Sequence, residues 1–222
     1  MTQPALGRKL AAWWILVGAL ILVAFWSASL PEEDRNQADA VYTYEFGVGG
    51  LVLYAILLGV VLAIAIGLDW RETFALRRPT SWTTAGLLAL ATLIGLFVVA
   101  AALEFVFHTG EEQGLDPTGW QPDHAGAFVL SFLAIAVLGP ITEELTFRGL
   151  GFFLLNQFGT VAAVAISAIT FALAHGIAVG VPVFFVIGVG LAYMRVRTRS
   201  ILPAILVHVL FNGLQLVASV SA

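Results

Sequence analysis

The chain consists mainly of long apolar segments separated by short polar ones. Apolar runs of roughly 17–25 residues are typical of helices that cross a bilayer. Seven apolar segments follow one another, at residues 10–29, 46–68, 83–107, 125–158, 161–175, 181–194 and 201–220, of which 125–158 is too long to be one simple span. The pattern predicts an all-α fold, a polytopic transmembrane helix bundle of about seven spans.

Composition supports a membrane protein. Hydrophobic residues make up 60% of the 222 positions, charged residues only 11%, and the mean hydropathy is +0.97. A soluble domain carries about 25% charged residues. The chain has no cysteine, which excludes disulfides, thiolate nucleophiles and cysteine-based zinc sites. We expect a multi-pass protein of the cell membrane whose partners include the lipid bilayer and no nucleic acid.

The charged residues divide the loops into two kinds. Three basic groups precede the first span or follow the second and sixth: Arg8 and Lys9; Arg71, Arg77 and Arg78; and Arg195, Arg197 and Arg199. The loops after the first and third spans are acidic. Seven alternating spans would place all three basic groups on one face, which the positive-inside rule identifies as cytoplasmic. We therefore predict a cytoplasmic N-terminus and acidic outer loops.

Two segments each allow two interpretations. The first apolar run ends in small residues at 27–29, as a signal peptide does. Its length and its tryptophans, Trp13, Trp14 and Trp26, instead favour an uncleaved anchor whose tryptophans lie at the membrane interface. Residues 69–82 mix aromatic and charged side chains, and either lie along the interface or form an ordinary polar loop.

Charged and polar residues occur inside the apolar segments of the second half. A charged side chain in hydrocarbon costs about 2.5–3.5 kcal/mol on insertion scales, so it is retained when it is paired, hydrated or functional. Glu144 and Arg148 share a helix face at i,i+4 and can form an ion pair. Glu143 is rotated by ~100° from Glu144, which leaves it free to act as a general base. Pro140 is expected to interrupt the same helix.

Two imidazoles complete the set of candidate site residues. His208 and Asn212 also share a helix face, where they can bind a metal or donate to a developing oxyanion. His175 closes the fifth apolar segment. Counting at 1.5 Å per residue from the turn at 157–160 places Glu143 and His175 at the same depth, ~21–23 Å from that turn, and His208 at a shallower level. The pattern predicts one intramembrane site.

In chain order, three motifs resemble those of one protein family. They are Glu143-Glu144-x-x-x-Arg148, Phe171-x-x-x-His175 and His208-x-x-x-Asn212. They resemble the CPBP (CAAX protease and bacteriocin-processing, or Abi) intramembrane proteases, relatives of the Rce1-type prenyl-protein endopeptidases. The resemblance covers about residues 130–212. We divide the chain into residues 1–124, the first three helices with their acidic outer loops, and residues 125–222, the catalytic helix bundle.

The resemblance implies a reaction and roles for the residues. Glu143 would activate a water for attack on a peptide bond with help from His175, while His208 and Asn212 would hold the oxyanion or a metal. Zn²⁺ held by Glu143, His175 and His208 with a water would make the protein a metalloprotease, and a metal-free mechanism uses the same residues. The implied substrate is a peptide or membrane-protein segment, with prenylated proteins and bacteriocin leaders as candidates.

Two other functions would also place polar residues within a membrane. In a transporter, the buried charges would relay ions or protons. Transporters usually have paired halves with matching broken helices, whereas the polar residues here are concentrated in the second half. An inactive relative could serve as an immunity protein or scaffold, but such a protein tends to lose a catalytic group. The complete set of motifs favours the endopeptidase.

Overall fold

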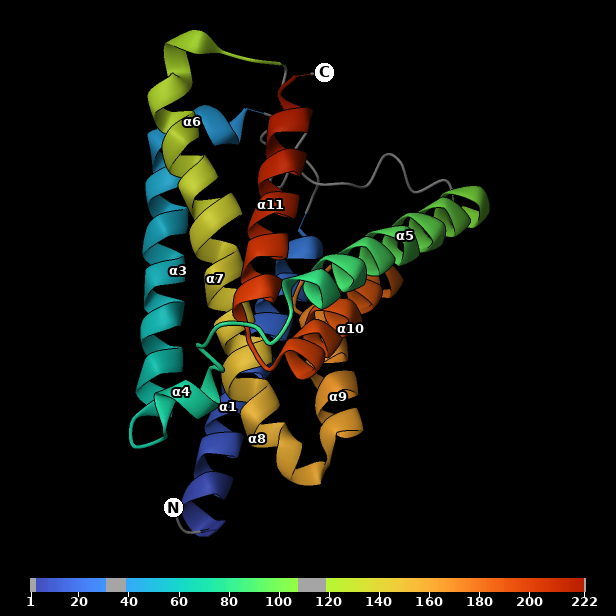
Figure 1. The fold of residues 1–222 in the computed structure, drawn as a ribbon. Helices are drawn as coiled ribbons and strands as arrows, with labels where there is room; N and C mark the ends of the chain where they lie inside the picture. Colours follow the sequence, from blue (N-terminus) through green and yellow to red (C-terminus); the bar gives the residue numbers. More distant parts are fainter. Residues whose placement is uncertain (1–2, 31–38, 108–118, 222) are drawn as a thin grey trace.

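The computed structural model describes residues 3–30, 39–107 and 119–221, and these form helices and turns with no strand (Figure 1). The predicted all-α fold is confirmed. The helices of the first half are α1 (Gln3–Ala28), η1 (Ala40–Tyr42), α3 (Tyr44–Ala65), α4 (Trp70–Thr73) and α5 (Trp82–Phe107). Those of the second half are η3 (Pro122–His124), α6 (Ala125–Phe132), η4 (Leu133–Leu138), α7 (Gly139–Glu144), η5 (Leu145–Gly151), α8 (Phe152–Leu155), η6 (Asn156–Phe158), α9 (Thr160–Leu173), α10 (Val181–Thr198) and α11 (Leu202–Ser219).

Six helices in the described ranges are long and apolar enough to cross a membrane. They are α1, α3, α5, the 37-residue helix Pro122–Phe158, α10 and α11. The expected fifth span is the 14-residue helix α9, which at 1.5 Å per residue reaches only ~21 Å, less than the ~30 Å of a hydrocarbon core. The protein is therefore a multi-pass membrane protein with six candidate spans and one shorter apolar helix, close to the predicted seven.

Pro140 does not interrupt its helix, contrary to the expectation from sequence. Residues 122–158 are helical throughout, and π-helical segments lie on both sides of α7: η4 before Pro140 and η5 after Glu144. Proline lacks an N–H and its ring clashes with the carbonyl four residues back in an α-helix. The wider π turn moves hydrogen bonding to the fifth residue back, so the chain passes Pro140 without a break.

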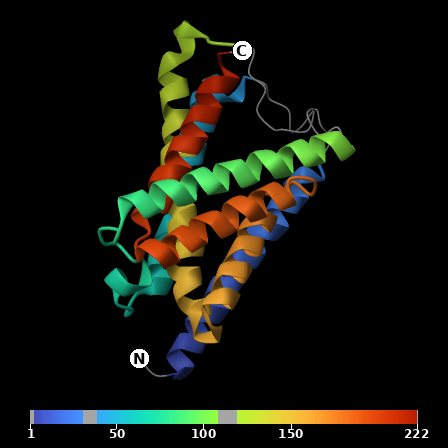
Figure 2. The same cartoon turned by 45° about the vertical axis from the view of Figure 1, so that its right-hand side comes forward.

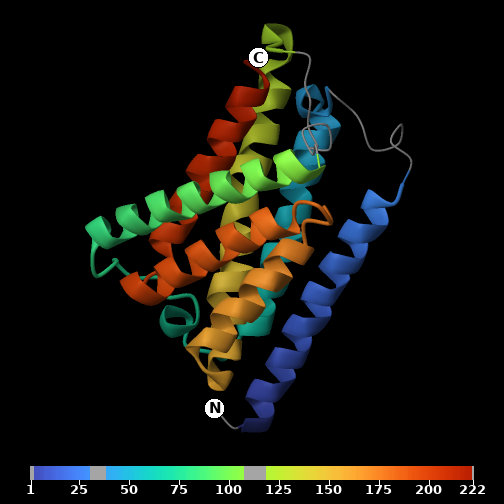
Figure 3. The same cartoon turned by 90° about the vertical axis from the view of Figure 1, so that its right-hand side faces the viewer.

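The bundle is built from two sets of helices that run in different directions. α5 and α10 lie side by side and cross the long helix and α11 obliquely (Figure 2). α9 packs against α10, and α3 packs against α6. α1 runs along the outside of the bundle (Figure 3), where it contacts α3, α8 and α9. This arrangement encloses α7 and η5, the segment that carries the Glu143 and Arg148 motif.

Trp13 is a core residue and not the interfacial tryptophan expected from the sequence. Its side chain is fully buried, and its indole Nε1–H donates to the carbonyl of Thr146 at 2.9 Å. The indole lies against Gly151, where a Cβ would come within 2.6 Å of the ring. Trp14 and Trp26 are exposed, as the interfacial interpretation requires. α1 is therefore anchored to η5, next to the candidate site.

Residues 69–82 cover the C-terminal end of α10. α4 starts at an Asp69 cap, and Phe74 after it is fully buried. The following loop pairs with the turn after α10, since Thr80 N–H donates to Thr198 O at 2.9 Å and Ile201 N–H donates to Ala75 O at 3.2 Å. The segment thus combines the four-residue helix α4 with an ordered loop, and its location at the membrane interface stays a prediction.

The two ends of the bundle bear on the predicted topology. Figure 1 shows the N-terminus, α4 and α8 at one end, and the C-terminus and the start of α6 at the other. Most of the predicted acidic outer-loop residues fall in 31–38 and 108–118, outside the described residues. The cytoplasmic location of the N-terminus and the boundary at residue 124 stay predictions.

The orientation can be tested with single cysteines, because the natural chain has none. Asp123 and Arg78 are exposed residues that the predicted topology places on opposite sides of the membrane. We expect a membrane-impermeant maleimide added to intact cells to label the Asp123→Cys variant and to spare Arg78→Cys. After permeabilisation both variants should react, which serves as the control. Labelling of Arg78→Cys alone in intact cells would reverse the orientation.

Candidate active site

Glu144 and Arg148 form the buried ion pair that their spacing predicted. Arg148 Nη1 donates to Glu144 Oε1 at 2.9 Å, and both side chains are completely buried. Arg148 Nη2 also donates to Gly188 O of α10 at 3.3 Å, and the guanidinium lies over the Phe171 ring at 4.0 Å. Arg148 therefore connects the long helix to α9 and α10 as well as balancing the charge of Glu144.

His208 lies between the two carboxylates. Its Nδ1 is 3.0 Å from Glu144 Oε1, and its Nε2 is 3.8 Å from Glu143 Oε2. Since a carboxylate oxygen only accepts, Nδ1 carries the hydrogen of the first contact. Sequence reasoning missed the bond to Glu144, because it joins residues 64 positions apart and no local spacing reveals it.

The predicted shallower depth of His208 is wrong. Residue counting assumed that helices start at the same level and run antiparallel. In Figure 1 the first turns of α11 lie beside α7 and not beside α8, and α11 packs against α7. This displacement brings His208 to the depth of Glu143 and Glu144. The three residues therefore lie closer together than residue counting predicted.

Glu143 is the partly exposed carboxylate of the pair. Its side chain is 23% exposed, and within the described part of the chain its Oε2 has no hydrogen-bond partner. The 3.8 Å gap to His208 Nε2 is too long for a direct hydrogen bond. Glu144, by contrast, is fully buried and accepts from two side chains through Oε1, while its Oε2 has no hydrogen-bond partner among the described residues. The two neighbouring carboxylates therefore have different environments, as the 100° rotation between them predicted.

His175 is held in one tautomer in the turn after α9. Its Nδ1 is 2.8 Å from Phe171 O, and because a carbonyl only accepts, Nδ1 carries the hydrogen. In the neutral ring Nε2 then has a free lone pair. The imidazole stacks on Phe184 with ring centroids 3.9 Å apart, and Glu143, His208 and Arg148 lie close enough to interact with it electrostatically. The structure thus brings His175 to the same cluster.

Phe171 connects the members of the cluster, a role that sequence reasoning did not assign. Its ring is buried, and the ring centroid lies 4.6 Å from that of His175 and 5.8 Å from that of His208. The guanidinium of Arg148 lies over the face of the same ring. The only sequence signal was its position one turn before His175. An aromatic residue in an apolar helix is otherwise indistinguishable from ordinary core.

Asn212 is bonded to the backbone at the proline site. Gly139 N–H donates to Ala134 O, five residues back. The next bond of this kind would run from residue 140 to Ile135 O, but Pro140 has no N–H. Asn212 Nδ2 donates to that carbonyl at 3.3 Å. The described contact of Asn212 is therefore structural, and its second amide hydrogen is what a substrate oxyanion could use.

Tyr54 of α3 is a further residue near the site that the sequence did not indicate. It packs against Gly139, where a Cβ would lie 2.9 Å from its Cζ, and it is close enough to Glu143 to interact electrostatically. A tyrosine inside an apolar span has no local pattern that distinguishes it from an interfacial residue. The first half of the chain thus reaches the Glu143 side of the cluster.

A large apolar cavity of about 970 Å³ lies beside the cluster, between α5, α10 and α11. Asn212 and Ile135 line it, and so does Phe184, on which His175 stacks. Most of its other lining residues are aliphatic or aromatic. The cavity joins a polar reaction centre to an apolar binding volume of the size usual for small-molecule sites.

The candidate zinc ligands do not form a three-ligand group. Among residues 3–30, 39–107 and 119–221, no three histidine or acidic side chains are placed to hold one metal ion. His175 and His208 each use Nδ1 for another contact, which leaves a single nitrogen of each ring for a metal. We therefore derive no step through zinc, and the metal stays a prediction for experiment.

A helical membrane protein with carboxylates, imidazoles and a carboxamide beside an apolar cavity has the groups that an intramembrane endopeptidase needs. Residues 125–214 match the family model described as Rce1-like, the type II CAAX prenyl endopeptidase Rce1-like family. The matched segment includes every candidate site residue, so the Rce1-like resemblance is confirmed. No curated protein and no solved structure matches the chain significantly. The Abi and metalloprotease designations stay predictions.

Proposed function

We propose that the protein cleaves prenylated CAAX-type peptides within the membrane, using a water activated by Glu143. The observation that carries this proposal is the pair of unlike carboxylates in the Rce1-like segment. Glu144 is fully buried and its Oε1 is taken by Arg148 and His208, whereas Glu143 is 23% exposed and its Oε2, beside His208 Nε2, has no hydrogen-bond partner in the described part of the chain. A general base must have free acceptor capacity within reach of the proton that it takes. Of the two, only Glu143 combines a free oxygen with an exposed surface at which a water can bind.

In the proposed reaction, water binds between Glu143 Oε2 and the two imidazole Nε2 atoms. Glu143 takes one proton as the water oxygen bonds to the scissile carbonyl carbon. The resulting oxyanion accepts from protonated His208 and from the second amide hydrogen of Asn212. The C–N bond then breaks, and the proton on Glu143 passes to the leaving amine nitrogen. Glu144 holds His208 in orientation through Nδ1, and Arg148 balances the charge of Glu144.

The apolar cavity supports a lipidated substrate. A prenyl chain is a flexible hydrocarbon, and a cavity of about 970 Å³ beside Asn212 offers it an apolar environment next to the reaction centre. A bacteriocin leader would need polar contacts along an extended backbone, which the mainly apolar lining provides less well. An inactive scaffold would assign no role to the carboxylate of Glu143, whereas a transporter would use it as an ion or proton relay.

The test is cleavage of a defined peptide by the purified protein in nanodiscs. We expect a farnesylated CAAX peptide to release its last three residues, detected by mass spectrometry, and the same peptide without the prenyl group to be cleaved at least tenfold more slowly. Addition of 1,10-phenanthroline, a zinc chelator, should leave the rate unchanged. Absence of cleavage of any prenylated peptide would contradict the proposed substrate, and loss of activity that zinc restores would contradict the metal-free step.

A further inference from the structure

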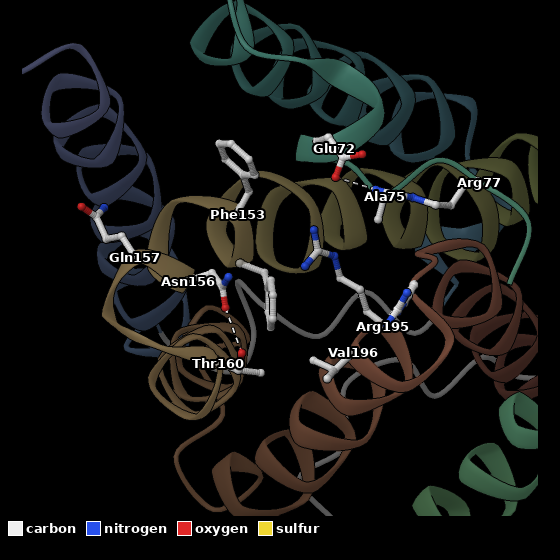
Figure 4. Close-up of a pocket in the computed structure, with 11 residues that line it drawn as sticks. Glu72, Ala75, Arg77, Phe153, Asn156, Gln157, Thr160, Arg195 and Val196 are labelled. Carbon is white, nitrogen blue, oxygen red and sulfur yellow. Dashed lines mark hydrogen bonds and ion pairs between the residues drawn. The ribbon is translucent and has the colours of Figure 1, made fainter. Parts of the chain in front are cut away.

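A second cavity, of about 510 Å³, is lined by residues of α4 and of the segments next to it (Figure 4). It is lined by α4 and the loop after it, by the end of the long helix, by the start of α9 and by the C-terminal turns of α10. On the long helix its lining begins at Phe152 and extends to Gln157. At 1.5 Å per residue, these positions are roughly 12–20 Å beyond Glu144. The proposed peptidase chemistry leaves this cavity unexplained.

The cavity is lined by three arginines and one carboxylate. The arginines are Arg77, Arg195 and Arg199, and the carboxylate is Glu72. Glu72 is already paired with Arg77 at 2.9 Å. In the described ranges neither Arg195 nor Arg199 forms an ion pair with a carboxylate. The cavity therefore has an excess of positive charge that the protein itself does not neutralise.

Arg195 is placed for a ligand inside the cavity. It is only 8% exposed, and Figure 4 shows its side chain extending into the middle of the cavity. Its Nη2 donates to Thr73 O at 3.2 Å and its guanidinium lies 4.2 Å over the Phe152 ring, so its position is fixed. Within the part of the chain that the structure describes, its Nε is buried without a hydrogen-bond partner. A buried donor of this kind is destabilising unless something accepts from it.

The location and the donors indicate the class of ligand. Exposed tryptophans, Trp70 and Trp82, flank the segment that covers this end of the bundle, and tryptophan concentrates at the level of lipid headgroups. The planar guanidinium fork matches phosphate oxygens in geometry and charge. We propose that this cavity binds a phosphate group through Arg77, Arg195 and Arg199, supplied by the headgroup of an anionic lipid or by free phosphate.

Thermal unfolding of the purified full-length protein in a neutral detergent separates the two sources. One arm titrates inorganic phosphate against sodium acetate of equal ionic strength. The other titrates dioleoylphosphatidylglycerol against dioleoylglycerol, which has the same chains without phosphate. A ligand that binds the folded state raises the melting temperature in a concentration-dependent way. We expect saturable stabilisation by the phosphate-bearing member of at least one pair.

Three variants locate the binding. Arg199→Gln removes an exposed charge, and Arg195→Lys keeps the buried charge but removes the fork; each should weaken phosphate-dependent stabilisation by about tenfold or more, as expected for lost charge-assisted hydrogen bonds. Arg197→Gln is the matched control, because Arg197 is on the same helix end but does not line the cavity. It should bind as the wild type does.

Each outcome decides for or against the proposal. Stabilisation by the lipid alone identifies a headgroup as the source, and stabilisation by inorganic phosphate identifies the free anion as sufficient. The proposal is overturned if neither stabilises, or if acetate and dioleoylglycerol are equally effective. It is also overturned if Arg197→Gln loses as much affinity as Arg199→Gln, because that result would indicate general attraction of an anion to a basic surface.

Discussion

Replacement of Glu143 by glutamine is expected to abolish peptide cleavage while leaving the protein folded. Glutamine has the shape of glutamate but cannot take a proton from water, and the loss of a general base typically lowers the rate by about 10²–10⁴-fold. Glu143 Oε2 has no protein partner in the described residues, so the substitution breaks no buried hydrogen bond there. The measurement is the rate of tripeptide release from a prenylated CAAX peptide, alongside the melting temperature.

Variants of the neighbouring site residues test whether the loss of cleavage comes from the proposed role of Glu143. His175→Ala and His208→Ala should also abolish cleavage, and a Glu143→Gln/His175→Ala double variant should be hardly worse than either single one, because groups that act together are not additive. Asn212→Ala should retain more activity, since loss of one oxyanion donor costs about 10²–10³-fold and His208 still donates. A Glu143→Gln enzyme with wild-type rate would exclude Glu143 as the base.

Much of the fold follows from the apolar pattern, and the exceptions have physical causes. Segments such as 46–68 correspond to helices because twenty apolar residues in lipid must satisfy their own backbone hydrogen bonds. The short α9 was predicted as a full span because its apolar run continues into the turn that carries His175. The continuity of the helix through Pro140 was missed because hydropathy contains no information on π turns.

In the site, contacts within one helix were predictable from the sequence, and contacts between helices were not. The pair Glu144–Arg148 was predictable because both residues lie on one helix, where a spacing of four fixes their relative direction. The bonds from His208 to Glu144 and from Asn212 to Ile135 cross between helices. They depend on how far α11 is displaced along α7, which the sequence periodicity of either helix does not specify.

His208 and Asn212 form one i,i+4 motif, but the two residues have different roles. Both side chains lie on one face of α11, as predicted. His208 nevertheless contacts the carboxylates, while Asn212, one turn further on, replaces the hydrogen bond that Pro140 cannot make. Because the proline, the π turn and the asparagine meet at Ile135, the helix irregularity and the placement of α11 stabilise one another. The geometry of the polar cluster therefore depends on backbone features outside it.

Replacement of Arg148 by alanine is expected to destabilise the protein as well as to inactivate it. Removal of one partner of a buried ion pair typically costs about 3–5 kcal/mol, because the remaining charge is left uncompensated in a low-dielectric environment. Here Glu144 is completely buried, and Arg148 also bonds Gly188 O and covers the Phe171 ring. The free energy of unfolding, measured by SDS titration in mixed micelles, should fall by about this amount.

Two comparisons distinguish loss of the ion pair from loss of a large side chain. Arg197→Ala removes an exposed arginine whose described contact is to Tyr193, and it should leave the free energy of unfolding nearly unchanged. Adding Glu144→Gln to Arg148→Ala removes the uncompensated charge, so the double variant should regain part of the lost stability, yet it should stay inactive because His208 loses its carboxylate partner. If Arg148→Ala unfolds at the same SDS concentration as the wild type, the ion pair does not stabilise the fold, and Arg148 would then act in catalysis alone.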